Sequence, residues 1–135
     1  PSLQHLPSSL FELPHLQTLK IKTKGAISEM DGVPKRLGPL RHLFLTGVGL
    51  TRLPEWFTGL TQLETLDQSG CRLTALPGDF SRLSRLKRLS LDDNGFKTLP
   101  PVLEGMKSIN HLSLDGNPFS EEEKARIQRV LGIWF

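Results

Sequence analysis

The sequence lacks the motifs that carry most enzyme and metal chemistry. It has no glycine-rich phosphate loop, no His-Glu-x-x-His, no Cys-x-x-Cys pair and no Gly-x-Ser-x-Gly. Its four histidines, His5, His15, His42 and His111, are scattered along the chain, and none has a second ligand at helix or hairpin spacing. We therefore expect no metal, no cofactor and no catalytic residue here, although a parent protein could carry a separate catalytic domain.

Cysteine is almost absent. The one cysteine, Cys71, excludes a disulfide within the chain, and no Asn-x-Ser/Thr glycosylation acceptor occurs. Both features favour a reducing, cytoplasmic compartment. Because nothing near Cys71 in the sequence would lower the pKa of its thiol, we interpret it as a buried structural residue and not as a nucleophile.

Long apolar runs and blocks of like charge are also missing. No apolar stretch approaches 18 residues, so no transmembrane helix is predicted, and no signal peptide begins the chain. The net charge of +3 is mild and spread out, which argues against nucleic-acid binding. The first residue is a proline, which we interpret as the start of a fragment.

What the sequence has instead is a repeat. Residues 86–94 are Leu-Lys-Arg-Leu-Ser-Leu-Asp-Asp-Asn, and residues 109–117 are Ile-Asn-His-Leu-Ser-Leu-Asp-Gly-Asn. The first apolar residues of successive units are separated by 24, 23, 23 and 23 positions; they are Leu16, Leu40, Leu63, Leu86 and Ile109. A constant period of this length predicts a stack of similar structural units.

The pattern inside each unit predicts a short strand followed by a turn. Leu89 and Leu91 would point to one side of the strand and Ser90 to the other. One such strand buries little, so several units must stack to form a parallel sheet over a common apolar interior. Asn94 and Asn117 fall where the chain leaves the strand, and their amides can satisfy the backbone groups of neighbouring turns.

This pattern, L-x-x-L-x-L-x-x-N, resembles that of the leucine-rich repeat family. The pairs Leu53-Pro54, Leu76-Pro77 and Leu99-Pro100 resemble its LP-containing class. The resemblance implies an α/β solenoid, a horseshoe with short parallel strands on its concave side and irregular structure on its convex side. We expect one domain over residues 1–135, with a partial repeat at 1–15, repeats at 16–119 and a capping helix at 120–135.

Three local features refine this picture. Ser120 and Glu123 form a capping-box pattern before a helix that Gly132 would end; its apolar stripe is Ala125, Ile127, Val130, Leu131 and Trp134. We interpret this helix as a lid over the last repeat, the alternative being an amphipathic membrane or partner helix.

Gln68 replaces an interior leucine and should be bonded to backbone or water. Phe57, Phe80 and Leu103 recur in register and should be core, whereas Trp56 is either half-buried or an exposed contact.

The outward residues of the strands supply the candidate site. Basic residues gather at the early end of this concave face, acidic residues gather at the later end, and Phe44 lies between them as an exposed aromatic. An aromatic surrounded by charge is a typical interface anchor, although a wet sheet face is polar in any protein. The candidate partner-binding residues are Lys20, Lys22, Arg41, His42, Phe44, Thr65, Asp67, Arg88, Asp92, His111 and Asp115.

The sequence therefore predicts a monomeric module that recognises a partner protein, possibly a host protein, through its concave face. An alternative from another class is the substrate-recognition domain of a larger bacterial effector enzyme, such as an E3 ubiquitin ligase, delivered into the host cytosol. A third hypothesis is a purely structural segment of a longer horseshoe.

Overall fold

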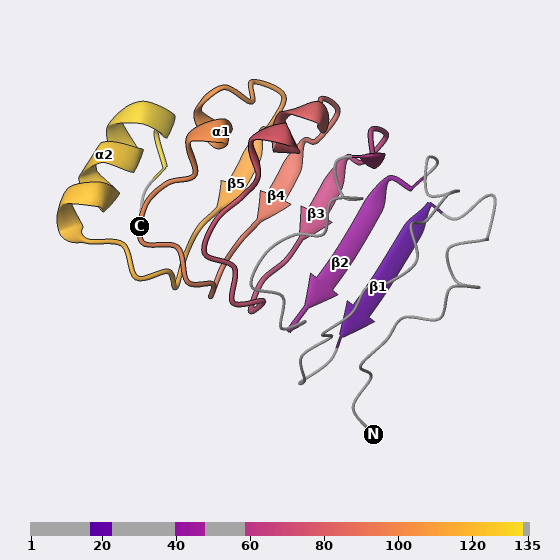
Figure 1. The fold of residues 1–135 in the computed structure, drawn as a ribbon, viewed down its shortest axis with the longest axis horizontal. Coiled ribbons are helices and arrows are strands. Elements are labelled where there is room, and N and C mark those ends of the chain that lie inside the picture. Colours follow the sequence, from indigo (N-terminus) through magenta and orange to yellow (C-terminus); the bar gives the residue numbers. More distant parts are fainter. Residues whose placement is uncertain (1–16, 23–39, 48–58, 134–135) are drawn as a thin grey trace.

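The computed structural model describes residues 17–22, 40–47 and 59–133. Within them, five parallel strands form one sheet in sequence order, and Figure 1 shows the strands side by side. The strands are β1 (Thr18–Lys22), β2 (His42–Thr46), β3 (Thr65–Asp67), β4 (Arg88–Ser90) and β5 (His111–Ser113). The partial repeat at 1–15 and the side chains of Trp56, Phe57 and Trp134 lie outside the described residues.

The strand register reproduces the sequence period. Thr18 lies opposite His42, and the next partners along the same row are Thr65, Arg88 and His111. Leu43, Leu66 and Leu89 form the adjacent row and are all buried. The predicted stack of parallel strands over one apolar interior is therefore confirmed.

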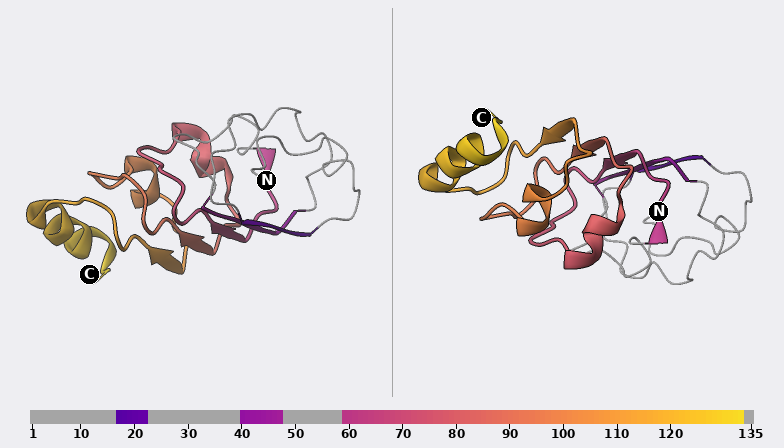
Figure 2. Two further views of the ribbon diagram at one scale, coloured as in Figure 1. Left: turned by 90° about the horizontal axis from the view of Figure 1, so that it is seen from below. Right: turned by 90° about the horizontal axis from the view of Figure 1, so that it is seen from above.

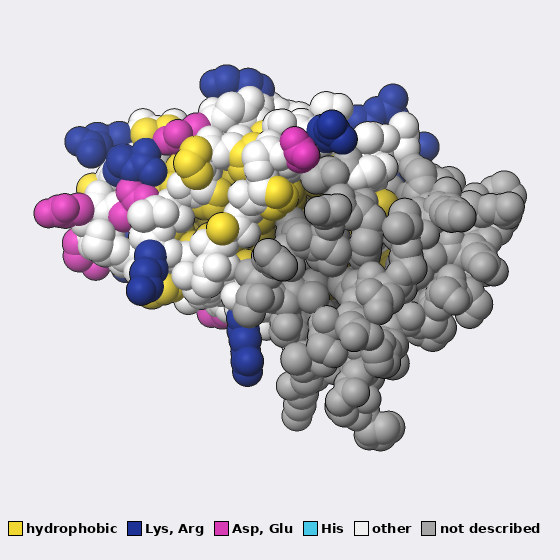
Figure 3. Space-filling model, in the orientation of Figure 1, with side chains coloured by type: hydrophobic (Ala, Val, Ile, Leu, Met, Phe, Trp, Pro, Cys, Tyr) yellow, Lys and Arg dark blue, Asp and Glu magenta, His cyan; other side chains and the backbone are white. Residues whose placement is uncertain are grey.

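The opposite side of the core is closed by short helical turns. A 3₁₀ helix, η3 (Gly78–Arg82), and a single turn of α-helix, α1 (Pro101–Glu104), occupy equivalent places in two successive units. They bury Phe80 and Leu103, as expected. Figure 2 shows these turns on one side of the molecule and the strands on the other, and Figure 3 views the convex side. The side that carries the strands corresponds to the concave face predicted from the sequence.

The turns after β4 and β5 are held by the two predicted asparagines. The Asn94 Oδ1 atom accepts hydrogen bonds from the backbone N–H groups of Cys71 and Leu73, at 2.9 and 3.0 Å. Its Nδ2 atom donates to the carbonyls of Gln68 and Leu91, at 2.9 and 3.0 Å. Asn117 makes the corresponding bonds one unit later. Buried backbone groups of adjacent units are thus paired through side-chain amides.

Cys71 occupies the same place one unit earlier and is fully buried, as predicted. Its thiol lies 2.8 Å from the carbonyl oxygen of Leu45, to which it donates. This carbonyl is 26 residues before Cys71, and Asn94 donates to a carbonyl at the same separation, that of Gln68. The thiol therefore supplies the donor that an asparagine supplies in the later units.

The backbone bond expected as one possibility for the Gln68 amide is not formed among the described residues. The residue is fully buried, but neither its Oε1 nor its Nε2 atom has a hydrogen-bond partner in the described structure. The side chain takes the inward place that Leu91 and Leu114 hold in later units, where the surroundings are apolar. Both backbone groups of Gln68 are hydrogen-bonded: its N–H donates to the Ser90 carbonyl, and its carbonyl accepts from the Asn94 side-chain amide.

The chain continues into helix α2 (Glu121–Leu131), which follows β5 at the end of the sheet (Figure 1). The Ser120 side chain caps it by accepting from the Glu123 N–H at 3.1 Å. Ile127 is buried and Leu131, one turn later, is half-buried, so this row covers the last repeat. Val130 was wrongly placed in the apolar stripe: it is 47% exposed, because it lies to one side of that row.

Glu123 also ties α2 to the rest of the fold. Its carboxylate accepts a hydrogen bond from the Leu99 N–H at 2.8 Å and pairs with Arg126 at 2.6 Å. Arg126 reaches Glu104 of α1 at 2.8 Å. The Arg126 hydrogen bond, aided by the Leu99 N–H, lowers the pKa of Glu123, and the two carboxylates raise the pKa of Arg126.

Candidate functional site

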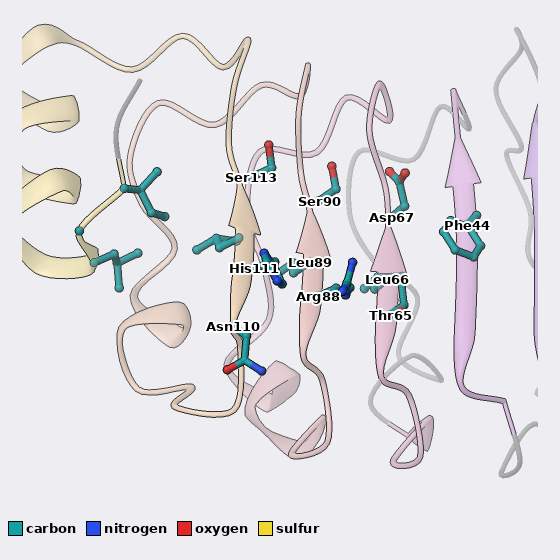
Figure 4. Close-up of a pocket in the computed structure, with 14 residues that line it drawn as sticks. Phe44, Thr65, Leu66, Asp67, Arg88, Leu89, Ser90, Asn110, His111 and Ser113 are labelled. Carbon is teal, nitrogen blue, oxygen red and sulfur yellow. The ribbon is translucent and has the colours of Figure 1, made fainter.

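The exposed face of the sheet is organised in rows that cross the strands. One row contains His42, Thr65, Arg88 and His111, and a second contains Phe44, Asp67, Ser90 and Ser113. Side chains alternate along each strand, so both rows point away from the core while the leucines between them point inward. Figure 4 shows Thr65, Arg88 and His111 near the strand starts, and Asp67, Ser90 and Ser113 near the strand ends.

A groove of about 600 Å³ runs over this face from Phe44 on β2, past β5, to the end of α2. Five of the predicted partner-binding residues line it together: Phe44, Thr65, Asp67, Arg88 and His111. Ser90 and Ser113 line the same groove. A volume of this size lies within the range of ligand-binding clefts in proteins.

The groove is polarised along the strands as well as across them. Arg88 and His111 begin β4 and β5 and are exposed. Among the described residues, no ion pair includes either side chain. Asp67 ends β3, and its Oδ1 atom accepts the Ser69 N–H at 3.0 Å. The strand starts therefore offer a guanidinium and an imidazole to a ligand, and the strand ends offer a carboxylate.

Phe44 lines the other end of the groove, and Lys20, which lies outside the lining, contacts its ring. The Lys20 Nζ atom lies 5.1 Å from the centroid of the Phe44 ring, a cation–π contact worth about 0.5–1 kcal/mol at an exposed site. The ring was expected to be exposed, but it is half-buried.

The remaining predicted residues lie elsewhere on the surface. Arg41 lies 3.8 Å from Glu64 at the strand starts and lines a separate depression. The Asp92 Oδ1 atom accepts from Ser113 at 2.5 Å and from the Asp115 N–H at 2.8 Å, so it ties adjacent turns together.

Three more of the predicted residues are outside the groove lining. His42 is half-buried in the same row as Arg88, and Asp115 is exposed beyond the end of β5. Only the backbone of Lys22 is described. The structure thus brings five of the predicted partner-binding residues together in the groove and places the others outside its lining.

The sequence prediction missed the wall at the far end of the groove. Leu131, Gly132 and Ile133 line it, whereas the sequence analysis assigned this segment to a capping helix, with a membrane or partner helix as the alternative. One feature of the sequence could have indicated part of it, because Leu131 follows Ile127 by one helical turn. The left-handed conformation of Gly132, with φ of 70°, is seen only in the structure.

The groove contains side chains suited to non-covalent recognition. Hydroxyl groups, a carboxylate, a guanidinium and an imidazole accompany apolar surface at both ends. Residues 17–22, 40–47 and 59–133 contain no group of three histidine, cysteine or acidic side chains that could hold a metal ion. In the same ranges, no helix has the length and apolar character needed to cross a membrane.

Comparison with known proteins agrees with this architecture. The family model described as a leucine-rich repeat region matches residues 28–132. A leucine-rich repeat protein of Leptospira interrogans is 35% identical, with a TM-score of 0.82 over 97% of this chain and 33% of that one. Internalin C2 of Listeria monocytogenes is 26% identical, with a TM-score of 0.74 over 89% of this chain and 50% of that one.

A third structure, the Toll–Spätzle complex of Drosophila, is similar in fold, with 24% identity and a TM-score of 0.72 over 86% of this chain and 16% of that one. This chain therefore spans a third to a half of the bacterial proteins and less of Toll–Spätzle. No curated protein sequence matches it. The spacing, the parallel sheet and the matched family model together establish that the chain belongs to the leucine-rich repeat family.

Proposed function

We propose that the chain binds a partner protein through the groove between Phe44 and the end of α2. The observation that carries this proposal is a face of a parallel sheet that no described helix or strand covers and that gathers an aromatic ring and opposite charges. Parallel sheets are usually covered on both faces. An open face with this composition is available to another molecule, and repeat proteins use such extended surfaces for binding.

Phe44 is the proposed anchor of the interface. Aromatic side chains dominate the binding energy of protein interfaces when a partner desolvates them. Asp67 and Arg88, on either side of the groove, would fix the orientation of the partner and raise the rate of association. Thr65, Ser90 and Ser113 would supply hydrogen bonds to a polar rim.

Several finer points belong to the same proposal. We propose a monomeric module of the LP-containing class acting in a reducing, cytosolic compartment, because a single cysteine precludes disulfide caps within the chain. A host protein as partner and a role as the substrate-recognition part of a bacterial effector enzyme stay predictions. Their support is the 35% identity to a bacterial repeat protein of which this chain spans a third.

The test compares two charge-matched double variants by affinity capture and by titration of the captured protein. The first, Phe44→Glu with Asp67→Lys, changes the groove. The second, Val102→Glu with Asp79→Lys, introduces the same charges on the convex side. Circular dichroism first establishes that both are folded.

We expect the groove variant to lose at least tenfold in affinity for a protein that the unchanged chain and the convex variant both bind. Equal affinity for all three proteins would overturn the proposal. Loss of binding only in the convex variant would move the interface to the other side of the repeat.

A further inference from the structure

We propose that a second site, at the starts of the strands, binds a sugar phosphate. The site is a depression of about 530 Å³, which we call the strand-start pocket; Arg41, Glu64, Arg85, Lys87 and Asn110 border it together with two serines. Asn110 is shared with the groove, and the other side chains lie outside the groove lining. The proposal therefore goes beyond the binding of a partner protein on the sheet face.

The period of the repeat brings four of these side chains into one row. The row consists of Arg41, Glu64, Lys87 and Asn110, which follow one another at intervals of 23 residues and directly precede the first residues of their strands. Backbone hydrogen bonds fix the row: the Glu64 N–H donates to the Arg41 carbonyl at 2.7 Å, and Lys87 and Asn110 repeat this bond at 2.8 Å. Adjacent strands lie about 4.8 Å apart, so a small ligand can contact several units at once.

The charge of the pocket favours a phosphate near Arg85. Three cationic side chains and one carboxylate line the pocket, which gives the lining a formal charge of +2. A phosphate monoester carries a charge of about −1.5 to −2 at neutral pH and offers three acceptor oxygens. Arg85 is exposed, and its one side-chain bond among the described residues joins Nη1 to the Gln62 Oε1 atom at 2.7 Å. Most of its guanidinium N–H groups therefore remain for an anion.

Lys87 and Asn110 supply further donors to the same phosphate. Both side chains are exposed, and Figure 4 shows Asn110 at the start of β5. The Lys87 Nζ atom lies 3.5 Å from the Glu64 Oε1 atom. An ammonium group has three N–H donors, so this ion pair leaves donors for a ligand. A guanidinium, an ammonium and an amide from neighbouring units can thus bind the oxygens of one phosphate.

Glu64 favours a sugar phosphate over a bare phosphate. Its side chain is 28% exposed and lies between two cations, 3.5 Å from Lys87 and 3.8 Å from Arg41. An ionised carboxylate accepts hydrogen bonds and donates none, so Glu64 repels a phosphate but can bind the hydroxyl groups of a sugar. No aliphatic or aromatic residue lines the pocket. A peptide with apolar side chains would therefore bury little apolar surface there.

The experiment titrates the 135-residue chain, labelled with ¹⁵N, with glucose 6-phosphate, glucose and inorganic phosphate, and follows the backbone amide resonances by NMR. We expect the largest shifts at Lys87 and Asn110. Glucose 6-phosphate should bind at least tenfold more tightly than glucose and at least threefold more tightly than inorganic phosphate. Equal affinity for phosphate and glucose 6-phosphate, or shifts confined to other parts of the chain, would overturn the proposal. Tighter binding of a peptide that carries phosphoserine would also overturn it.

Reversal of one charge tests the phosphate contact. Arg85→Glu should weaken the binding of glucose 6-phosphate at least tenfold, because a carboxylate then faces the phosphate. Arg129→Glu, the same change at an exposed site of α2 outside the pocket, should leave the affinity within twofold of the unchanged chain. Equal losses in both variants would mean that the ligand responds only to net charge, which would overturn the proposal. Thermal unfolding checks that both are folded, and Arg85→Gln replaces Arg85→Glu if that protein does not fold.

Removal of the carboxylate tests the sugar contact. Glu64→Ala should weaken the binding of glucose 6-phosphate and strengthen that of inorganic phosphate, so that the ratio of the two affinities falls at least threefold. Glu121→Ala, the same change at a side chain that is 92% exposed, should leave this ratio unchanged. An unchanged or larger ratio for Glu64→Ala would show that the carboxylate does not bind the sugar and would overturn the proposal.

The groove variant Phe44→Glu, Asp67→Lys separates this proposal from the proposed function. It should bind glucose 6-phosphate normally, because neither residue lines the strand-start pocket. Loss of glucose 6-phosphate binding in this variant would place the ligand in the groove and overturn the proposal, whatever the result of protein capture.

Discussion

Two neighbouring units of this solenoid build the same turn from different side chains. In the turn after β4, Asn94 accepts from two backbone N–H groups and donates to backbone carbonyls. In the turn after β3, Cys71 donates its thiol hydrogen to the Leu45 carbonyl. The inward residue three positions earlier also differs, since it is Leu91 in one unit and Gln68 in the other.

This difference separates what the repeat requires from what it tolerates. Both turns keep a buried side chain that donates to a carbonyl 26 residues earlier, so this donor is common to the two units. A thiol is a weaker donor and acceptor than an amide. Gln68 adds a buried amide without a partner among the described protein atoms, which no later unit carries. The earlier unit is therefore expected to be the less stable of the two.

The largest change in the free energy of unfolding is expected from Asn94→Ala. This change leaves two buried N–H groups, those of Cys71 and Leu73, and the Gln68 carbonyl without their side-chain partner. The Leu91 carbonyl loses one of two side-chain donors, because the Asn117 amide still donates to it. Each buried unsatisfied group costs about 1–3 kcal/mol, and relaxation recovers part of this, so we expect a loss of about 3–5 kcal/mol in the free energy of unfolding.

Urea denaturation measures this loss. Asn110→Ala, the removal of an exposed amide, serves as control and should change the free energy by less than about 0.5 kcal/mol. A loss below about 1 kcal/mol for Asn94→Ala would mean that the amide does not hold the units together.

A smaller effect of opposite sign is expected from Gln68→Leu. The change removes two buried polar atoms that lack partners and installs the residue found at Leu91 and Leu114. We expect unfolding to cost about 1–3 kcal/mol more. The reverse change, Leu91→Gln, should destabilise the later unit and make it resemble the earlier one. Destabilisation by Gln68→Leu would show that the amide is stabilised in its buried position.

The comparison also shows how far the sequence predicts the fold. The period, the inward leucines and the turn asparagines were confirmed because each follows from local alternation and backbone satisfaction, which a single unit specifies. Gln68 was predicted to be bonded because buried amides usually are. Its lack of a partner depends on the apolar neighbours contributed by adjacent units, which the pattern of one unit does not specify.

The part of the candidate site formed by outward residues of the strands was predictable from the sequence. The groove wall formed by the end of α2 was not. Phe44, Asp67 and Arg88 share one groove because alternation places them on one face. The Leu131–Ile133 wall depends on where the capping helix packs and how Gly132 reverses the chain, which is tertiary information. Asp92 was assigned to partner binding from its outward position, but its Oδ1 atom pairs with the next turn.

The smallest effect on stability is expected from the hydrogen bond that the Leu99 N–H donates to Glu123 of α2. The unit that contains Asn94 has this bond, and the unit that contains Cys71 has no counterpart to it among the described residues. Because Arg126 and the Leu99 N–H lower the pKa of Glu123 below its ordinary value of 4.5, folding favours the ionised carboxylate. Its stabilising contribution is therefore fully present above pH 4.5 and is lost as the pH falls through the lowered pKa. Partial exposure of Arg126 screens the pair, so we expect a contribution of about 1 kcal/mol from Glu123 at neutral pH.

Thermal unfolding from pH 7 to pH 3 tests this contribution. Glu123→Gln should lower the melting temperature at pH 7 and have a smaller effect at pH 3, where the unchanged carboxylate has begun to protonate. Glu121→Gln is the matched control, since its side chain is 92% exposed two positions earlier in the same helix. If both variants show the same dependence on pH, Glu123 does not tie α2 to the later unit, and the two units differ in stability only through their turns.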